Sequence, residues 1–147
     1  MCERQAVRYQ IVNIIPNIQL LMQTPRYLLA VDFFGAIATS LATTFLLASG
    51  RMPTGLPTWL LYSLAMVALG FACFDAAAIS QFFDARIALA TIAYLNLSYC
   101  VAVLVVLCVC RREATQLCLF YFCVELAIVI PLAYWELTIS KKPFAGL

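Results

Sequence analysis

The chain contains no histidine and few charged residues. Histidine is the commonest metal ligand and the usual proton shuttle near neutral pH, so its absence excludes histidine-ligated haem and the ordinary catalytic triads. Charged residues make up 11% of the 147 residues, and hydrophobic residues make up 65%. A typical soluble domain has about a quarter of its residues charged. The composition therefore predicts one compact membrane domain.

Two further absences narrow the function. The net charge is only +2, and no water-exposed segment interleaves basic with aromatic residues, which excludes a nucleic-acid partner. None of the seven cysteines forms a C-x-x-C pair, so the thioredoxin-like redox motif is missing. Cys110 and Cys118 flank a short turn and could pair only if the turn brings them within disulfide range. We favour free thiols, and we predict no metal, no cofactor and no catalytic residue, which makes an enzyme the less favoured class.

Four apolar runs are each long enough to cross a bilayer, which takes about 20 residues. We place the spans at 27–49, 58–80, 87–110 and 114–137. The links between them are short and hold turn-forming residues, which favours antiparallel packing of sequential helices. The predicted fold is all-α: an up-down four-helix transmembrane bundle over residues 27–147.

Residues 1–26 form a separate N-terminal arm in this scheme. Apolar residues recur there at helical spacing with polar residues between them, and Pro16 interrupts the pattern. Such an amphipathic segment lies in the membrane interface, or it packs on the bundle or on a partner subunit. The sequence leaves both interpretations open.

The positive charges are unevenly distributed over the two ends of the predicted bundle. Six of the nine Lys and Arg residues fall on the side of the two termini, and three fall on the opposite side. Because loops rich in Lys and Arg stay in the cytoplasm, we expect both termini there, in an inner or plasma membrane.

Polar side chains interrupt all four predicted spans on faces expected to point into the bundle. They are Asp32, Asp75, Asn96, Tyr99, Tyr121, Glu125 and Glu136. A carboxylate at mid-membrane depth costs roughly 2.5 to 3.5 kcal/mol, and the predicted spans contain no Lys or Arg to offset it. We therefore expect some of these acids to be protonated at neutral pH. The set is either a proton or cation site, or hydrogen-bonding contacts between helices.

Glu125 lies near the middle of the fourth span. Tyr99 and Glu125 are each about thirteen residues from the turn at 111–113, so an equal rise per residue places them at equal depth. We predict that Glu125 faces inward, is protonated, and bonds to Tyr99 or Asn96.

Several short segments form a wider pattern of positions. They are residues 32–36 (DFFGA), 52–53 (MP), 61–62 (LY), 71–72 (FA), 96–100 (NLSYC), 121–125 (YFCVE) and 133–136 (AYWE). From Val31 onward this pattern resembles a group of small bacterial four-span membrane proteins without an assigned activity. The resemblance implies a four-helix membrane protein and no particular reaction. Asp75 departs from it, because such proteins would carry a neutral residue there.

Three functions are consistent with these observations. The first is a structural or interaction subunit, which forms a homo-oligomer or joins a larger membrane complex. The second is a proton- or cation-conducting channel or small transporter that uses the intramembrane acids. The third is an intramembrane lipid-binding protein or enzyme. The expected partners are the lipid bilayer and either further copies of the chain or other membrane subunits.

Overall fold

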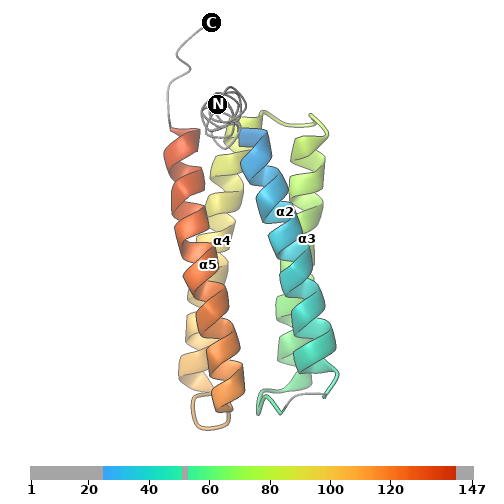
Figure 1. Ribbon diagram of the computed structural model, residues 1–147, viewed down its shortest axis with the longest axis vertical. Helices are drawn as coiled ribbons and strands as arrows, with labels where there is room; N and C mark the ends of the chain where they lie inside the picture. The colour runs from blue at the N-terminus through green and yellow to red at the C-terminus, as the bar shows by residue number, and fades with distance from the viewer. Residues whose placement is uncertain (1–24, 51–52, 142–147) are drawn as a thin grey trace, which may run out of the picture.

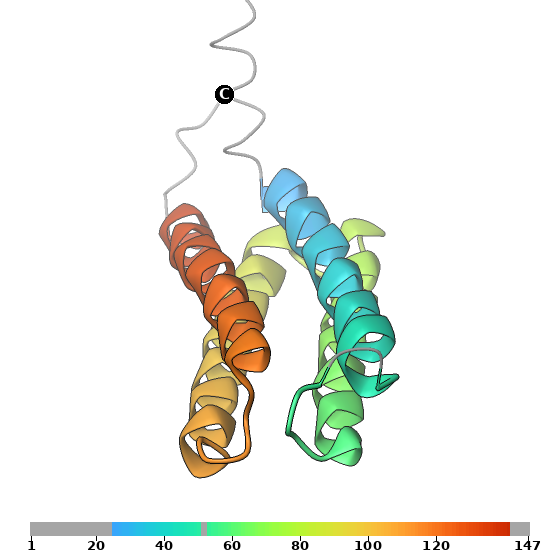
Figure 2. The same cartoon turned by 60° about the horizontal axis from the view of Figure 1, so that its bottom comes forward.

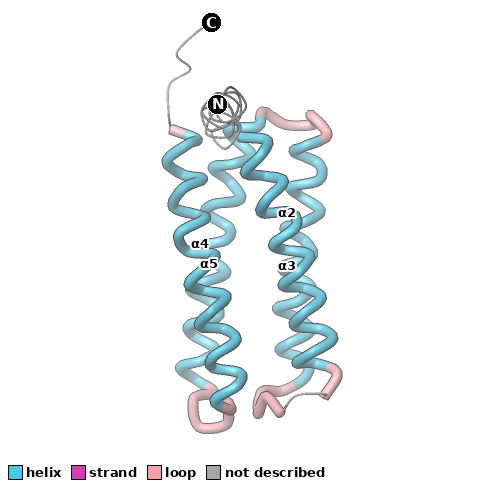
Figure 3. The backbone as a smooth tube through the Cα atoms, in the orientation of Figure 1, coloured by secondary structure: helices cyan, strands magenta, loops and turns pink. Residues whose placement is uncertain are grey.

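A computed structural model describes residues 25–50 and 53–141, and all regular structure in these two ranges is helical. The elements are α2 (Pro25–Ala42), the π-helical segment η1 (Thr43–Ala48), α3 (Thr58–Ile79), α4 (Ala85–Val109) and α5 (Gln116–Ser140). Figure 3 shows these helices joined by short loops. The prediction of an all-α protein is confirmed.

Four helices are long and apolar enough to cross a membrane, at Pro25–Phe45, Thr58–Ile79, Ala85–Val109 and Gln116–Ser140. They match the four predicted spans, with boundaries that differ by a few residues. The predicted N-terminal arm, residues 1–26, lies outside the described residues except for its last two.

The helices pack as two hairpins, α2 with α3 and α4 with α5 (Figures 1 and 2). The connections α2–α3 and α4–α5 lie at one end of the bundle, which we call the loop end. The connection α3–α4 lies at the other, with the start of α2 and the end of α5, and we call it the terminal end. Contacts within each hairpin are extensive, whereas α2 and α5 contact each other much less. The seam between α2 and α5 is therefore a place where the packing is open.

Side-chain caps set the beginnings of the two helices of the second hairpin. The Asp84 carboxylate accepts hydrogen bonds from the backbone N–H groups of Arg86 and Ile87, at 2.8 and 3.2 Å. The Thr115 hydroxyl accepts from the N–H of Cys118 at 3.3 Å. These bonds satisfy N–H groups that have no partner inside a helix, so α4 and α5 begin directly after these residues.

Thr115 also joins the two hairpins at the loop end. Its N–H donates to the Thr54 carbonyl at 3.0 Å, and its hydroxyl donates to the Pro53 carbonyl at 2.7 Å. Gly55 lies in the same contact with φ of +73°, and a Cβ atom there would overlap the Glu113 carbonyl oxygen. We call this contact the loop clasp.

Apolar clusters lie toward both ends of the bundle: one takes residues from α2, α3, α4 and α5, and the other from η1, α3, α4 and α5. The terminal-end cluster consists of Leu28, Leu29, Ala78, Ala88, Leu89, Ile92 and Ile139. The loop-end cluster includes Leu47, Leu61, Val103, Leu107, Cys118 and Phe122. Asp32, Asp75, Asn96 and Glu136 lie next to the terminal-end cluster, whereas Tyr99 belongs to the loop-end cluster and Tyr121 packs against it.

The loop clasp predicts that Gly55→Ala is strongly destabilising. Alanine adds about 1 to 2 kcal/mol of backbone strain at positive φ, and its methyl group must displace the Glu113 backbone at a further cost of about 1 to 3 kcal/mol. Thermal unfolding in detergent measures the loss. Gly50→Ala is the matched control, because Gly50 has φ of +74° but a Cβ atom there meets nothing within 4 Å. Equal losses for the two variants would contradict the clasp.

Candidate functional site

One polar residue from each helix forms a layer directly inward of the terminal-end cluster. The four residues are Asp32, Asp75, Asn96 and Glu136, each three or four residues from a member of that cluster. The Asn96 side-chain amide donates to Asp32 Oδ1 at 2.9 Å. Asp75 and Glu136 are fully buried, and each is close enough to Asp32 to interact with it electrostatically. We call this set the polar layer.

Most carboxyl oxygens of the polar layer accept no well-formed hydrogen bond from an N–H or O–H group within the described ranges, although the Asp75 carboxyl group faces that of Asp32 and the Glu136 carboxyl group faces Asn96. They are both oxygens of Asp75, both oxygens of Glu136, and Oδ2 of Asp32. Within the four candidate spans, Lys and Arg occur only as Arg26 and Arg86, each in the first turn of its helix. The four described spans thus concentrate acids in a low-dielectric region and place no Lys or Arg at their depth.

A second set of polar contacts lies closer to the loop end. The Tyr99 hydroxyl donates to Glu125 Oε1 at 2.9 Å, which confirms the predicted contact between the third and fourth spans. Tyr121 bonds not to Glu125 but to the Thr43 hydroxyl, at 3.1 Å. Glu125 is buried as predicted, and its second oxygen, Oε2, has no partner among the described residues.

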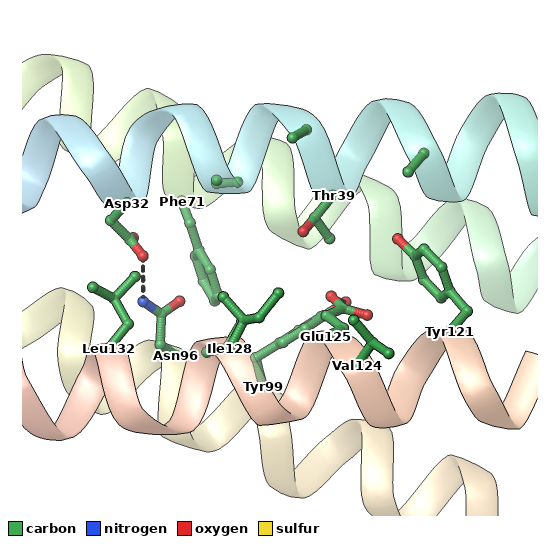
Figure 4. A pocket seen from close by; sticks show the side chains of 15 residues that line it. Asp32, Thr39, Phe71, Asn96, Tyr99, Tyr121, Val124, Glu125, Ile128 and Leu132 are labelled. Atoms are coloured by element: carbon green, nitrogen blue, oxygen red, sulfur yellow. Dashed lines mark hydrogen bonds between the residues drawn. The ribbon is translucent and has the colours of Figure 1, made fainter.

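A cavity of about 320 Å³ connects the two polar sets. Asp32 and Asn96 line one part of it, and Tyr99, Tyr121 and Glu125 line another. In Figure 4 the carboxyl groups of Asp32 and Glu125 both point into the space between α2 and α5. Small residues of α2 leave this space free, namely Gly35, Ala36, Ala38, Thr39 and Ala42.

The cavity opens sideways, toward the surface that faces lipid. Along the bundle axis it is bounded by the terminal-end and loop-end clusters. Its α5 wall includes Val124 and Ile128, which keep 43% and 63% of their surfaces exposed, and its α2 wall includes the exposed Gly35 and Ala38. A molecule dissolved in the bilayer therefore has direct access through the seam between α2 and α5.

The structure brings most of the predicted site residues into one site. Five of the seven line the cavity, whereas Asp75 and Glu136 lie beside it in the polar layer. Sequence reasoning missed the apolar walls, above all Phe71 and Ile128, and the role of Thr43 as the partner of Tyr121. Thr43 belongs to a run of small and polar residues that begins at Asp32 and recurs at helical spacing. This spacing places Thr43 on the same inward face as Asp32, so it could have indicated a polar contact for Thr43.

None of the six cysteines in residues 25–50 and 53–141 forms a disulfide. Cys110 and Cys118 are both free, as the sequence analysis favoured. Cys118 is fully buried in the loop-end cluster, where it packs as a small apolar side chain.

Comparison of the chain with protein-family models, with curated proteins and with solved structures finds no match. The resemblance to small four-span proteins receives no support from these comparisons.

The Tyr99–Glu125 contact predicts a graded response to substitution of Glu125. Glu125→Gln keeps an acceptor for Tyr99 and should change the free energy of unfolding by no more than about 0.6 kcal/mol, the average for a hydrogen bond between membrane helices. Glu125→Ala removes the acceptor and enlarges the cavity, so it should cost about 2 kcal/mol or more. Unfolding in mixed micelles measures both. Glu113→Ala, at an exposed acid of the loop end, is the control and should be neutral. Equal losses for the two Glu125 variants would show that the contact contributes nothing.

Proposed function

We propose that the protein binds a membrane-soluble small molecule whose polar part carries hydrogen-bond donors. One observation supports this most: an apolar cavity, open sideways to the lipid, contains two buried carboxyl groups that each have an oxygen without a partner. Ligand sites typically combine mostly apolar walls with a few convergent polar groups. Acceptors without donors call for a ligand that donates.

We favour a binding protein over a channel or transporter and over a purely structural subunit. A channel within one chain needs a polar path along the bundle, and the cavity is bounded at both ends by apolar clusters. A protein that served only as an interaction subunit would have no need of the cavity. A subunit of a larger complex can still carry such a site, and self-association remains compatible with it.

We further propose that the protein sits in an inner or plasma membrane with both termini in the cytoplasm. The support is the excess of Lys and Arg on the side of the termini, six against three. In this orientation the polar layer lies in the cytoplasmic half of the membrane. The cavity extends from it toward the midplane.

The proposal predicts that a ten-carbon alkylamine with a photoreactive diazirine in its chain labels the cavity. The purified protein is reconstituted in phosphatidylcholine nanodiscs, irradiated with the probe, and digested for mass spectrometry. Labels should concentrate on cavity-lining residues of α2 and α5, such as Ala38, Val124 and Ile128.

Two glycines provide a matched pair of variants for this experiment. A Cβ atom on either Gly35 or Gly70 meets nothing within 4 Å, but only Gly35 lines the cavity. Gly35→Leu should reduce labelling of the cavity at least fivefold, whereas Gly70→Leu should leave it unchanged. Both variants should fold, because leucine favours a helix over glycine by up to about 1 kcal/mol. Thr39→Leu fills the cavity from a second position, since the Thr39 side chain points into it (Figure 4). Labels spread evenly over the lipid-facing surface, and unchanged by Gly35→Leu and Thr39→Leu, would refute the proposal.

A further inference from the structure

The two carboxyl groups of the cavity are arranged alike, although they come from different helices. Asp32 uses Oδ1 to accept from Asn96, and Glu125 uses Oε1 to accept from Tyr99. In each case the second oxygen is without a partner, and the residues are only 5% and 7% exposed. Both residues line the same cavity, and each carboxyl group accepts one hydrogen bond from α4, while that of Asp32 also faces the Asp75 carboxyl group.

Helix geometry gives the separation of the two carboxyl groups along the bundle. In Figure 4, Leu132 of α5 lies opposite Asp32, and Thr39 of α2 lies opposite Glu125. Seven residues separate Asp32 from Thr39, and seven separate Glu125 from Leu132. At a rise of 1.5 Å per residue, both helices place the two carboxyl groups about 10 Å apart along the axis.

The space between the carboxyl groups is walled by apolar side chains. Phe71 and Ile128 lie there (Figure 4), and Val129 of α5 also lines the cavity. A complementary ligand has a donor at each end and an apolar chain between them. No group of three His, Cys, Asp or Glu side chains among the described residues is arranged to hold a metal ion.

We propose that the cavity binds an elongated α,ω-diamine with an apolar chain, which enters from the bilayer as the neutral base and becomes a dication in the site, with one ammonium group on Asp32 and the other on Glu125. This inference rests on the proposed function and specifies its ligand class. Each amino group takes the proton of its acid and becomes a cation at a depth where the described spans contain no Lys or Arg, and the Asp32 end also lies near Asp75 and Glu136. A chain of seven carbons spans about 10 Å between its terminal nitrogens when extended, which matches the separation of the acids.

Competition against the photoreactive alkylamine in nanodiscs tests whether one ligand contacts both Asp32 and Glu125, an arrangement that we call the two-ended site. The competitors are 1,7-diaminoheptane, 1-aminoheptane with the same chain and one amine, and 1,3-diaminopropane with two amines too close together. A second charge-assisted hydrogen bond strengthens binding about tenfold or more. We therefore expect 1,7-diaminoheptane to displace the probe at a concentration at least tenfold below that of 1-aminoheptane, and 1,3-diaminopropane to show no such advantage.

Single substitutions assign the two ends. Asp32→Asn and Glu125→Gln should each abolish the advantage of the diamine over the monoamine, while the probe still labels the cavity. Glu113→Gln removes an exposed acid at the loop end and should retain the advantage. Glu125→Gln keeps the Tyr99 contact, so it serves as the test if Asp32→Asn fails to fold.

The outcomes separate this inference from the proposed function. If the probe labels the cavity but the diamine has no advantage, or if the advantage survives in both variants, the two-ended site is wrong and the binding function stands. If the probe does not label the cavity of the unsubstituted protein, the proposed function fails and the inference fails with it.

Discussion

Burial of carboxyl groups without cations is the constraint that governs this bundle. A charged or unbonded carboxyl is costly in the hydrocarbon region, so each must be hydrogen-bonded, neutral or matched by a ligand. Two side chains of α4 meet part of this demand: Asn96 donates a hydrogen bond to Asp32, and Tyr99 donates one to Glu125. The structure leaves the other oxygens of those acids, and all those of Asp75 and Glu136, without partners in the described residues. Contacts that only joined helices would not need this surplus of acceptors.

The arrangement of apolar residues determines where the polar groups can act. Both ends of the bundle are packed with apolar side chains from four helical segments, whereas the middle of the α2–α5 seam is lined on one side by glycine, alanine and threonine. In a membrane, small residues usually allow two helices to approach closely. Here the two hairpins do not close over them, and the small residues form one wall of a cavity. The row of small residues on α2 therefore leaves a cavity and not a close helix contact, because α5 does not pack directly against it.

The sequence predicts the helices and one contact of the site, and it does so for identifiable reasons. Long apolar runs locate the spans, while exact ends depend on caps such as Asp84 and Thr115, which shift a boundary by a few residues. The Tyr99–Glu125 contact follows from equal distances to a tight turn, since α4 and α5 form one hairpin. The cavity has no such local signal. Its walls come from four helices, and its volume depends on the spacing of the two hairpins, which no pattern within one helix encodes.

The loop clasp has a mechanical consequence for the seam. The hairpins are tied at one end by Thr115 with Thr54 and Pro53, and at the other by the short chain from α3 to α4. Because the two hairpins are joined at both ends, the seam between α2 and α5 can widen most easily near its middle, where these helices can bend outward. The cavity lies in that part of the seam. The π-helical segment η1 (Thr43–Ala48) continues α2 toward the clasp, and its hydrogen bonds close a wider ring than those of an α-helix. Exchange of a molecule through the seam would then follow the curvature of α2 and α5, and a bilayer that presses the helices straight would slow it.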